Sequence, residues 1–269
     1  MKEIKEKFDF NGSPIVVSTG RLAKKADFSV LIEWGETVLL VTTGVGTKPI
    51  DRDFLPLSVE FQENLYAAGK IPGSFFRREG RPSQYSVLSA RLIDRSIRTL
   101  FPKSYRNEVQ VIVQPLAVDQ AIDIRVPAML ATSIALNAGT SPFSSLVASV
   151  NVGYKNGEFV CNPSQKEEGR SDLDLFLTGT EEKINMIEVS ANSLSEKDLY
   201  AAIEFGFAEI KRLIAFQKSF LKQASRPKVA FEEKKDEAAI AAVEEGYRAD
   251  IDKIIAEADS NKREALVAD

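Results

Sequence analysis

The chain has no histidine and only one cysteine in 269 residues. The lack of histidine excludes serine–histidine and cysteine–histidine nucleophile systems and the usual zinc ligand sets. The single Cys161 excludes an internal disulfide and a zinc site built from several thiolates, and its setting in GEFVCNP favours a buried structural thiol. Chemistry would therefore have to use carboxylates, lysine, arginine, hydroxyls or a hard metal ion.

Long apolar runs are also missing. No stretch approaches the roughly 18 apolar residues of a membrane-spanning helix. The opening residues, MKEIKEKFDF, are charged where a signal peptide would be apolar. We therefore expect a cytoplasmic protein.

Charge is unevenly distributed along the chain, whose formal net charge is −4. Residues 226–269 contain 12 acidic and 8 basic side chains, so the remainder contains 27 of each. Residues 69–106 contain nine basic residues and only two acidic ones. A local excess of this size can attract a polyanion despite the overall negative charge.

Alternating and β-branched patterns predict β-structure in the first 62 residues, with a hairpin turn at Gly35-Glu36. A helix is expected over 84–101, with Ser83 as its N-cap and Pro102 ending it. Its predicted apolar side consists of Leu88, Leu92, Ile93, Ile97 and Leu100. Its second face carries a row of guanidinium groups, because Arg91, Arg95 and Arg98 follow i, i+4, i+7 spacing.

The remaining pattern predicts a strand over 108–118, a buried helix over 126–139 and a hairpin around Asn156-Gly157. Two further strands and a long helix ending near Ala224 follow, at 172–180, 184–191 and 195–224. We expect an α+β domain over residues 1–225, with a mixed sheet and packed helices, and a separate helical segment over 226–269.

The segment GKIPGSFFRREGRPS, residues 69–83, carries the most distinctive chemistry. Its glycines permit sharp turns and its prolines restrict the loop, which lowers the entropy lost on binding. Unstacked bases can stack on the rings of Phe75 and Phe76, while guanidinium groups grip phosphates through paired hydrogen bonds. Phe75, Phe76, Arg77, Arg78 and Arg81 are therefore the candidate binding residues for single-stranded nucleic acid.

A structural alternative stays open for the same residues. Either phenylalanine can fill the core, and the arginines can be solvated or paired with Glu79 and Asp94. Lys48 and Lys70 are further possible phosphate contacts, although no motif distinguishes them from ordinary solvated lysines.

The stretches YAAGKIPGSFFRREGRPS and ARLIDRSIRTLFP closely resemble the first RNase PH-like core of bacterial polynucleotide phosphorylase. DFLPLSVEFQE, NEVQVI and DLDLFLTGT follow the same family order, so the resemblance covers residues 1 to about 225. It implies a phosphate-dependent 3′-to-5′ exoribonuclease that releases nucleoside diphosphates. Its implied partners are single-stranded RNA, a second RNase PH-like core and two further subunits of a homotrimer.

The resemblance also implies where catalysis belongs. In that family the second core supplies a serine cluster for phosphate, two aspartates and a lysine, with magnesium as the cofactor and inorganic phosphate as the co-substrate. The corresponding positions here are Glu168, Asp174 and Phe176, and DIRVPAM stands in place of the serines. We therefore predict no catalytic residues and no metal site in this chain.

The resulting hypothesis is that this chain is the RNA-guiding, non-catalytic half of a larger enzyme. Two alternatives to it remain. One is a stand-alone RNA-binding or assembly module, and the other is a self-sufficient RNase PH-like enzyme. For Asp172 and Asp174, the favoured interpretation is that alternating acids mark the exposed side of a strand rather than a magnesium site.

Overall fold

The computed structural model describes residues 2–73, 75, 77–119, 121–164, 171–232 and 237–268. The chain divides into two compact units, the first ending at Phe231 and the second beginning at Glu232. The first unit contains two β-sheets and three long helices, which confirms the predicted α+β class with a mixed sheet. Among the described residues, no helix is long and apolar enough to span a membrane.

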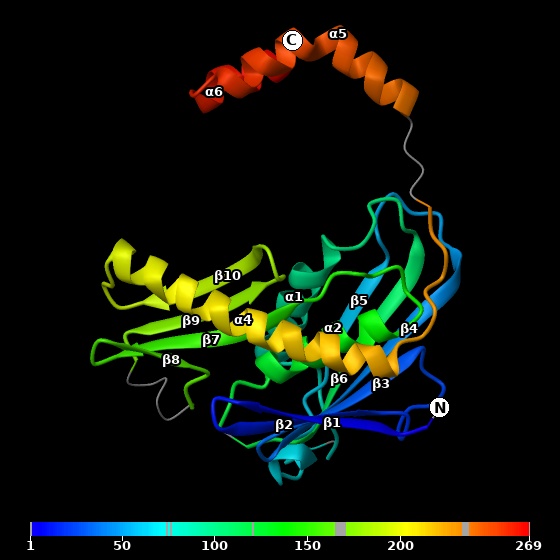
Figure 1. Ribbon diagram of the computed structural model, residues 1–269, viewed down its shortest axis with the longest axis vertical. Coiled ribbons are helices and arrows are strands. Elements are labelled where there is room, and N and C mark those ends of the chain that lie inside the picture. The colour runs from blue at the N-terminus through cyan, green and yellow to red at the C-terminus, as the bar shows by residue number, and fades with distance from the viewer. Residues whose placement is uncertain are drawn as a thin grey trace. The chain divides into compact units, whose positions relative to one another are not determined.

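The larger sheet has six strands in the order β1-β2-β3-β4-β6-β5 (Figure 1). Neighbouring strands are antiparallel except β5 and β6, which are parallel. Strand β5 is last in this order, so it is an edge strand with β6 as its only neighbour among the described strands. The bounds are β1 Ile4–Phe10, β2 Ser13–Thr19, β3 Phe28–Trp34, β4 Thr37–Pro49, β5 Leu57–Phe61 and β6 Asn107–Ala117.

The smaller sheet has four antiparallel strands in the order β10-β9-β7-β8. Its bounds are β7 Ala148–Lys155, β8 Glu158–Cys161, β9 Leu173–Gly179 and β10 Ile184–Ala191. Both predicted hairpin turns are confirmed. Gly35 has φ +61°, and Asn156 and Gly157 have φ +53° and +84°, the left-handed geometry that two-residue hairpin loops need.

Helix α2 (Arg125–Ala138) packs against strands of both sheets, and every residue after Arg125 in it is buried. The predicted apolar helix is therefore confirmed. Helix α4 (Glu196–Ala224) covers the smaller sheet along β7 and β9, as Figure 1 shows. Gly206 permits this close approach, since a Cβ there would lie 2.9 Å from a methyl of Val152 and 3.1 Å from one of Leu177.

Helix α1 (Gln84–Arg98) begins where the sequence predicts, because the Ser83 hydroxyl accepts the Ser86 amide at 3.2 Å. It ends at Arg98, three residues before the predicted end. The amides of Leu100 and Phe101 donate instead to the carbonyls of Ile97 and Arg98, three residues back. Hydrogen bonds of this 3-10 type end the α-helix. Leu88 does not belong to the apolar side: it is 58% exposed, whereas Leu92, Ile93 and Ile97 are buried.

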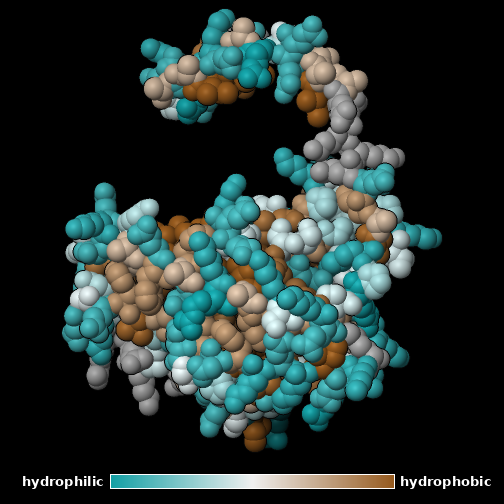
Figure 2. Space-filling model, viewed as in Figure 1, coloured by the Kyte–Doolittle hydropathy of each residue, from teal (hydrophilic) through white to brown (hydrophobic). Residues whose placement is uncertain are grey.

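The second unit contains helices α5 (Glu237–Ala256) and α6 (Ser260–Ala268). Their described side chains are almost all exposed, including apolar ones at 36–74% exposure (Ile240, Val243, Tyr247, Ile251 and Ile255). Figure 2 shows brown apolar atoms on this unit beside teal polar ones. The helical character predicted for the stretch after Pro227 is thus confirmed.

Candidate nucleic-acid interface

The candidate binding loop is anchored at both ends. A short 3-10 helix, η1 (Leu65–Ala68), precedes it, and Gly69 ends this helix with φ +68°, a conformation that glycine adopts without a steric penalty. The Gly69 and Lys70 amides donate to Tyr66 and Leu65 at 3.0 and 2.9 Å. At its other end the loop runs into the N-cap of α1, where the Ser83 hydroxyl accepts the Ser86 amide, so hydrogen bonds hold both of its ends.

Side chains on this loop are displayed to solvent. Phe75 is 95% exposed and Ile71 is 89% exposed, so neither fills the core. Arg77 and Arg78 are also exposed. Arg77 has φ +48°, which costs energy for a residue with a side chain. Phe76 lies outside the described residues. The core-filling alternative therefore does not apply to Phe75.

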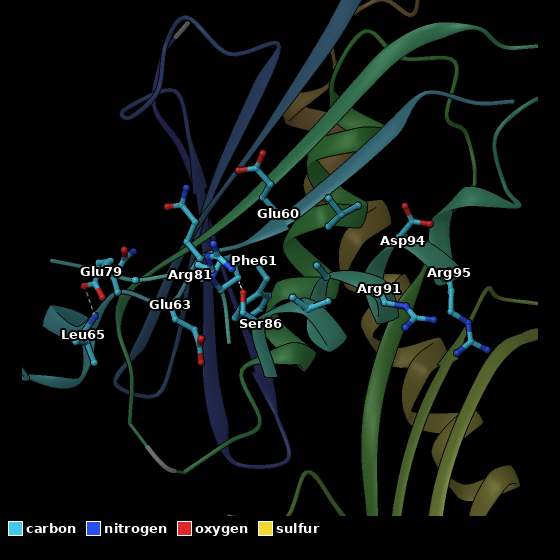
Figure 3. A pocket seen from close by; sticks show the side chains of 17 residues that line it. Glu60, Phe61, Glu63, Leu65, Glu79, Arg81, Ser86, Arg91, Asp94 and Arg95 are labelled. Carbon is cyan, nitrogen blue, oxygen red and sulfur yellow. Dashed lines mark hydrogen bonds between the residues drawn. The ribbon is translucent and has the colours of Figure 1, made fainter. Parts of the chain in front are cut away.

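A groove of about 880 Å³ lies beside the loop (Figure 3). Strand β5 and the segment that follows it form one wall, α1 forms another, and residues 79–82 close one end. Three guanidinium groups line the groove, those of Arg81, Arg91 and Arg95, and all three side chains are exposed. In the described part of the chain no hydrogen bond or ion pair engages any of the three.

Arg98 does not extend this cationic row. Its Nε and Nη2 donate to the Asp94 carboxylate, both at 2.7 Å, while Nη1 and Nη2 donate to the carbonyls of Leu55 and Leu57 at 2.9 and 3.0 Å. Asp94 raises the pKa of Arg98, mainly through this hydrogen bond. The sequence periodicity placed three arginines on one face, but only Arg91 and Arg95 remain available to a ligand.

The acidic residues that the sequence offered as partners are occupied elsewhere. Asp94 pairs with Arg98, and Glu79 Oε1 accepts the backbone amide of Leu65 at 2.9 Å. The side chains of Lys48 and Lys70 are exposed and have no partner among the described residues. They behave as solvated lysines in this structure.

A second cluster occupies the N-terminus of α2, where DIRVPAM replaces the expected serines. Arg125 Nε donates to Asp123 Oδ2 at 2.7 Å, and the Asp123 carboxylate also accepts the Arg125 amide at 2.9 Å. The Arg125 guanidinium carbon lies 4.9 Å from the centre of the Phe176 ring. Burial acts to lower the pKa of Arg125, but the hydrogen bond and charge of Asp123 outweigh it, so the pKa is raised.

One acid directly before β9 and one within it are placed as the favoured interpretation expects. Asp172 and Asp174 are exposed, whereas Phe176, next in the same alternation, is only 2% exposed. Asp174 contributes to the raised pKa of Arg125, so the two charges lie near each other. Glu168 lies outside the described residues. No group of three or more potential metal-ligating residues occurs in the described ranges.

Sequence reasoning missed the role of Arg125. The available signal was an acid followed two residues later by a base, immediately before an apolar helix. Such a pair can cap the helix and neutralise its own charge, and here it does both. Tyr85, whose ring centre lies 6.0 Å from the Arg125 guanidinium, has a raised pKa because burial, and then the Asp123 charge, disfavour its ionised form.

Family comparisons agree with this architecture. Residues 12–142 match the first domain of the 3′ exoribonuclease family (RNase PH), and residues 145–209 match its second domain. The chain belongs to the 3′ exoribonuclease family. Both matched segments lie within the unit that ends at Phe231, so the two family domains together build one compact body.

Relatives in this 3′ exoribonuclease family confirm the predicted resemblance. The chain is 45% identical to the polyribonucleotide nucleotidyltransferase of Oceanobacillus iheyensis over 85% of its own length and 33% of that protein's. It is 40% identical to the protein of the same name from an Exiguobacterium species, over 96% of this chain and 35% of the relative. The chain thus spans about a third of these relatives.

The crystal structure of rice Rrp46 supports the fold independently. It superimposes with a TM-score of 0.63 at 18% identity and covers 77% of this chain and 94% of the rice protein. At that identity the likeness concerns the fold alone. It shows that the arrangement of the two sheets and the helices is shared.

Proposed function

We propose that this chain is the first RNase PH-like core of a polyribonucleotide nucleotidyltransferase that degrades RNA from its 3′ end. In the complete enzyme, inorganic phosphate attacks the terminal linkage and a nucleoside diphosphate leaves. The role of this core is to hold and guide single-stranded RNA. Residues 1–225 form the core and residues 226–269 begin an all-helical linker.

The observation that carries the RNA-guiding role is the placement of Phe75 beside cationic side chains. Its ring is almost fully exposed on a loop that is anchored at both ends. Arg77 and Arg78 are exposed two and three residues farther along the same loop, and Arg81 of this loop lines the groove. An exposed ring stacks on a base of any identity, and guanidinium groups bind the phosphates. Together they suit a single strand without sequence preference.

A separate observation supports the absence of catalysis. At the N-terminus of α2 the Asp123 carboxylate is engaged by Arg125, and Phe176 presents an apolar ring where the family's second core has a lysine. These residues do not fit a magnesium ion, since Arg125 places a positive charge near Asp174. Magnesium, phosphate and the chemical step belong to the second core of the complete homotrimeric enzyme.

The test uses 5′-labelled single-stranded RNA with magnesium, with and without phosphate. RNA length is followed on a gel, and nucleoside diphosphate release is followed by chromatography. We expect bound but intact RNA. Phosphate-dependent shortening would contradict the assignment of catalysis to another core, and a failure to bind RNA at low salt would contradict the guiding role.

A stand-alone RNA-binding or assembly module is the second candidate, favoured only by the lack of catalytic equipment in this core. Determining the gene sequence downstream of the codon for Asp269 separates the two. A continuous reading frame into a second RNase PH-like core supports the enzyme, whereas a stop codon directly after it supports the module.

A further inference from the structure

We propose that Lys228 is a modification site: its ε-amine accepts an acyl group from a small acyl phosphate, and the modification loosens residues 226–231 from the rest of the first unit. These six residues, here called the strap, follow the end of α4 and form the last part of that unit, the orange trace in Figure 1. The inference does not depend on the proposed RNA-guiding function.

The strap is held to the end of α2 by its backbone and by Lys228. Two of its backbone amides donate to carbonyls at the end of α2 and just beyond it, both at 2.8 Å (Arg226 to Ala138 and Val229 to Thr140). Lys228 Nζ donates to the Leu136 carbonyl at 2.7 Å. This carbonyl lies in the last turn of α2, where an α-helix supplies no amide partner and a cation is favourable. Lys228 is therefore the strap's side-chain cap on that turn.

The amine of Lys228 combines access with a partly buried setting. The residue is exposed overall, so a small reagent can reach it. Burial lowers the pKa of its amine to about 8, although the negative charge of Asp27, directly before β3, acts in the opposite direction. The Asp27 carboxylate is itself engaged by Thr140, whose amide and hydroxyl donate to it at 2.9 and 2.7 Å. A neutral amine is therefore available near neutral pH, and this form is the nucleophile.

Two further ionisable side chains lie near the same aspartate. The Arg226 guanidinium donates to the Asp27 backbone carbonyl, which places a second cation close to the Lys228 amine. Tyr105 also experiences the Asp27 charge, and its pKa is raised, mainly by burial, so it stays neutral near pH 8. The permanent positive charge of Arg226 attracts an anionic acyl donor, which favours an acyl phosphate over an uncharged donor.

Acyl transfer to Lys228 needs no further reactant. The neutral nitrogen attacks the carbonyl carbon of the acyl phosphate, a C–N bond forms, and the bond from that carbon to the phosphate oxygen breaks. Inorganic phosphate leaves with the electron pair, and the amine releases a proton to solvent. The product has no charge, one N–H and a flat acyl group against the last turn of α2. It cannot keep the original bond to the Leu136 carbonyl without moving, so the strap loses this contact.

The first test treats the folded chain with acetyl phosphate at pH 7.5 and quantifies acetylation of each lysine by peptide mass spectrometry. About a quarter of amines with a pKa near 8 are neutral at this pH, against about one in 800 for an ordinary lysine. Their lower basicity offsets part of this gain, so we expect Lys228 to react about tenfold faster in the folded chain than in the chain unfolded by guanidinium chloride. Lys222, exposed on α4, normalises the two rates.

The pH dependence provides a separate check of the same site. The rate at Lys228 in the folded chain should level off above about pH 8.5, once most of the amine is neutral. Equal normalised rates in the folded and unfolded chains, or a folded-state rate that still rises steeply at pH 9, would overturn the assignment of Lys228 as the modification site.

The second test measures hydrogen exchange at the strap amides of Arg226 and Val229 by NMR. In the acetylated chain and in Lys228→Gln, both amides should exchange about threefold faster than in wild type, the size expected for one lost hydrogen bond. Lys228→Arg keeps a charged donor and is the matched control, with wild-type exchange. Unchanged exchange in both the acetylated chain and Lys228→Gln would overturn the loosening of the strap. Neither test uses RNA, so a failure here is distinct from a failure of the proposed function.

Discussion

Arg98 and Asp94 form a two-pronged ion pair one turn apart on α1, with both N–O distances at 2.7 Å. The same guanidinium bonds the carbonyls of Leu55 and Leu57, so one side chain joins the helix to the edge of the larger sheet. An arginine that periodicity places among the ligand-binding residues is therefore part of the framework that holds the groove open.

Replacing Arg98 with alanine should destabilise the first unit by about 1–3 kcal/mol, because two carbonyls and the Asp94 carboxylate lose their donor together. Urea denaturation monitored by tryptophan fluorescence measures this difference. Arg95→Ala, one turn away on the same helix and without a partner among the described residues, is the matched control and should change the unfolding free energy by less than about 0.5 kcal/mol. Equal losses in both variants would show that the bonds of Arg98 contribute nothing.

Replacing both Arg77 and Arg78 with alanine should flatten the salt dependence of RNA binding. The log-log slope falls by about 0.7 for every phosphate of a single strand that is no longer neutralised. Anisotropy titrations between low and moderate salt provide the slope. Lys197→Ala/Lys222→Ala removes two exposed charges from α4 and should leave the slope intact. A slope unaffected by the arginine changes would rule out phosphate binding by the loop.

Replacing Phe75 with alanine should weaken RNA binding by about 1–3 kcal/mol at every salt concentration, since stacking involves no counterion release. The unfolding free energy should stay unchanged, because this ring is 95% exposed. Tyr200→Ala, at 63% exposure on α4, controls for the removal of an exposed aromatic ring. Reduced stability with unchanged affinity would instead assign Phe75 a structural role.

Cys161 should make folding sensitive to alkaline pH. Burial, followed by the Glu209 charge, raises the pKa of its thiol to about 12. An unfolded thiol ionises near pH 9, so between pH 9 and 12 the folded state binds more protons and stability falls as pH rises. The contribution is fully present below pH 9.

Denaturant titrations at pH 8.5 and 10.5 test this dependence by comparison of wild type with Cys161→Ser. The serine hydroxyl does not ionise in this range, so the variant should lose less stability over the same interval. Tyr85 and Tyr105, whose pKa values are also raised by burial, remain in both proteins and cancel in the comparison. Parallel losses in the two proteins would show that the thiol ionises equally in both states.

Local patterns in the sequence determined most of the secondary structure. Both hairpin turns needed residues that accept positive φ, and Gly35, Asn156 and Gly157 supply them at the predicted places. The apolar run of α2 demanded burial, and the structure places it between the two sheets. Strand β1 lies in the first 62 residues, for which the sequence predicted β-structure as a whole, and its exposed positions, Lys5, Lys7 and Asp9, alternate with half-buried ones.

The loop was also predictable as a candidate binding segment, since its glycines, prolines, phenylalanines and arginines indicate that chemistry without reference to distant residues. The exposure of Phe75 and the direction of the Arg98 side chain could not be predicted from sequence, because each depends on residues that are distant in the chain and close in the fold. Arg98 turns inward because the carbonyls of β5 lie within its reach, and those residues are about forty positions earlier in the chain.

The sequence by itself therefore determined the family, the turns and most of the helical and strand segments. Only the tertiary structure decided that β5 is an edge strand, that Arg98 bonds to its carbonyl groups, and that Arg125 occupies the N-terminus of α2 beside Phe176. The physical reason is the range of the interactions. Propensity and periodicity act over a few residues, whereas strand order, grooves and ion pairs depend on segments that only folding brings together.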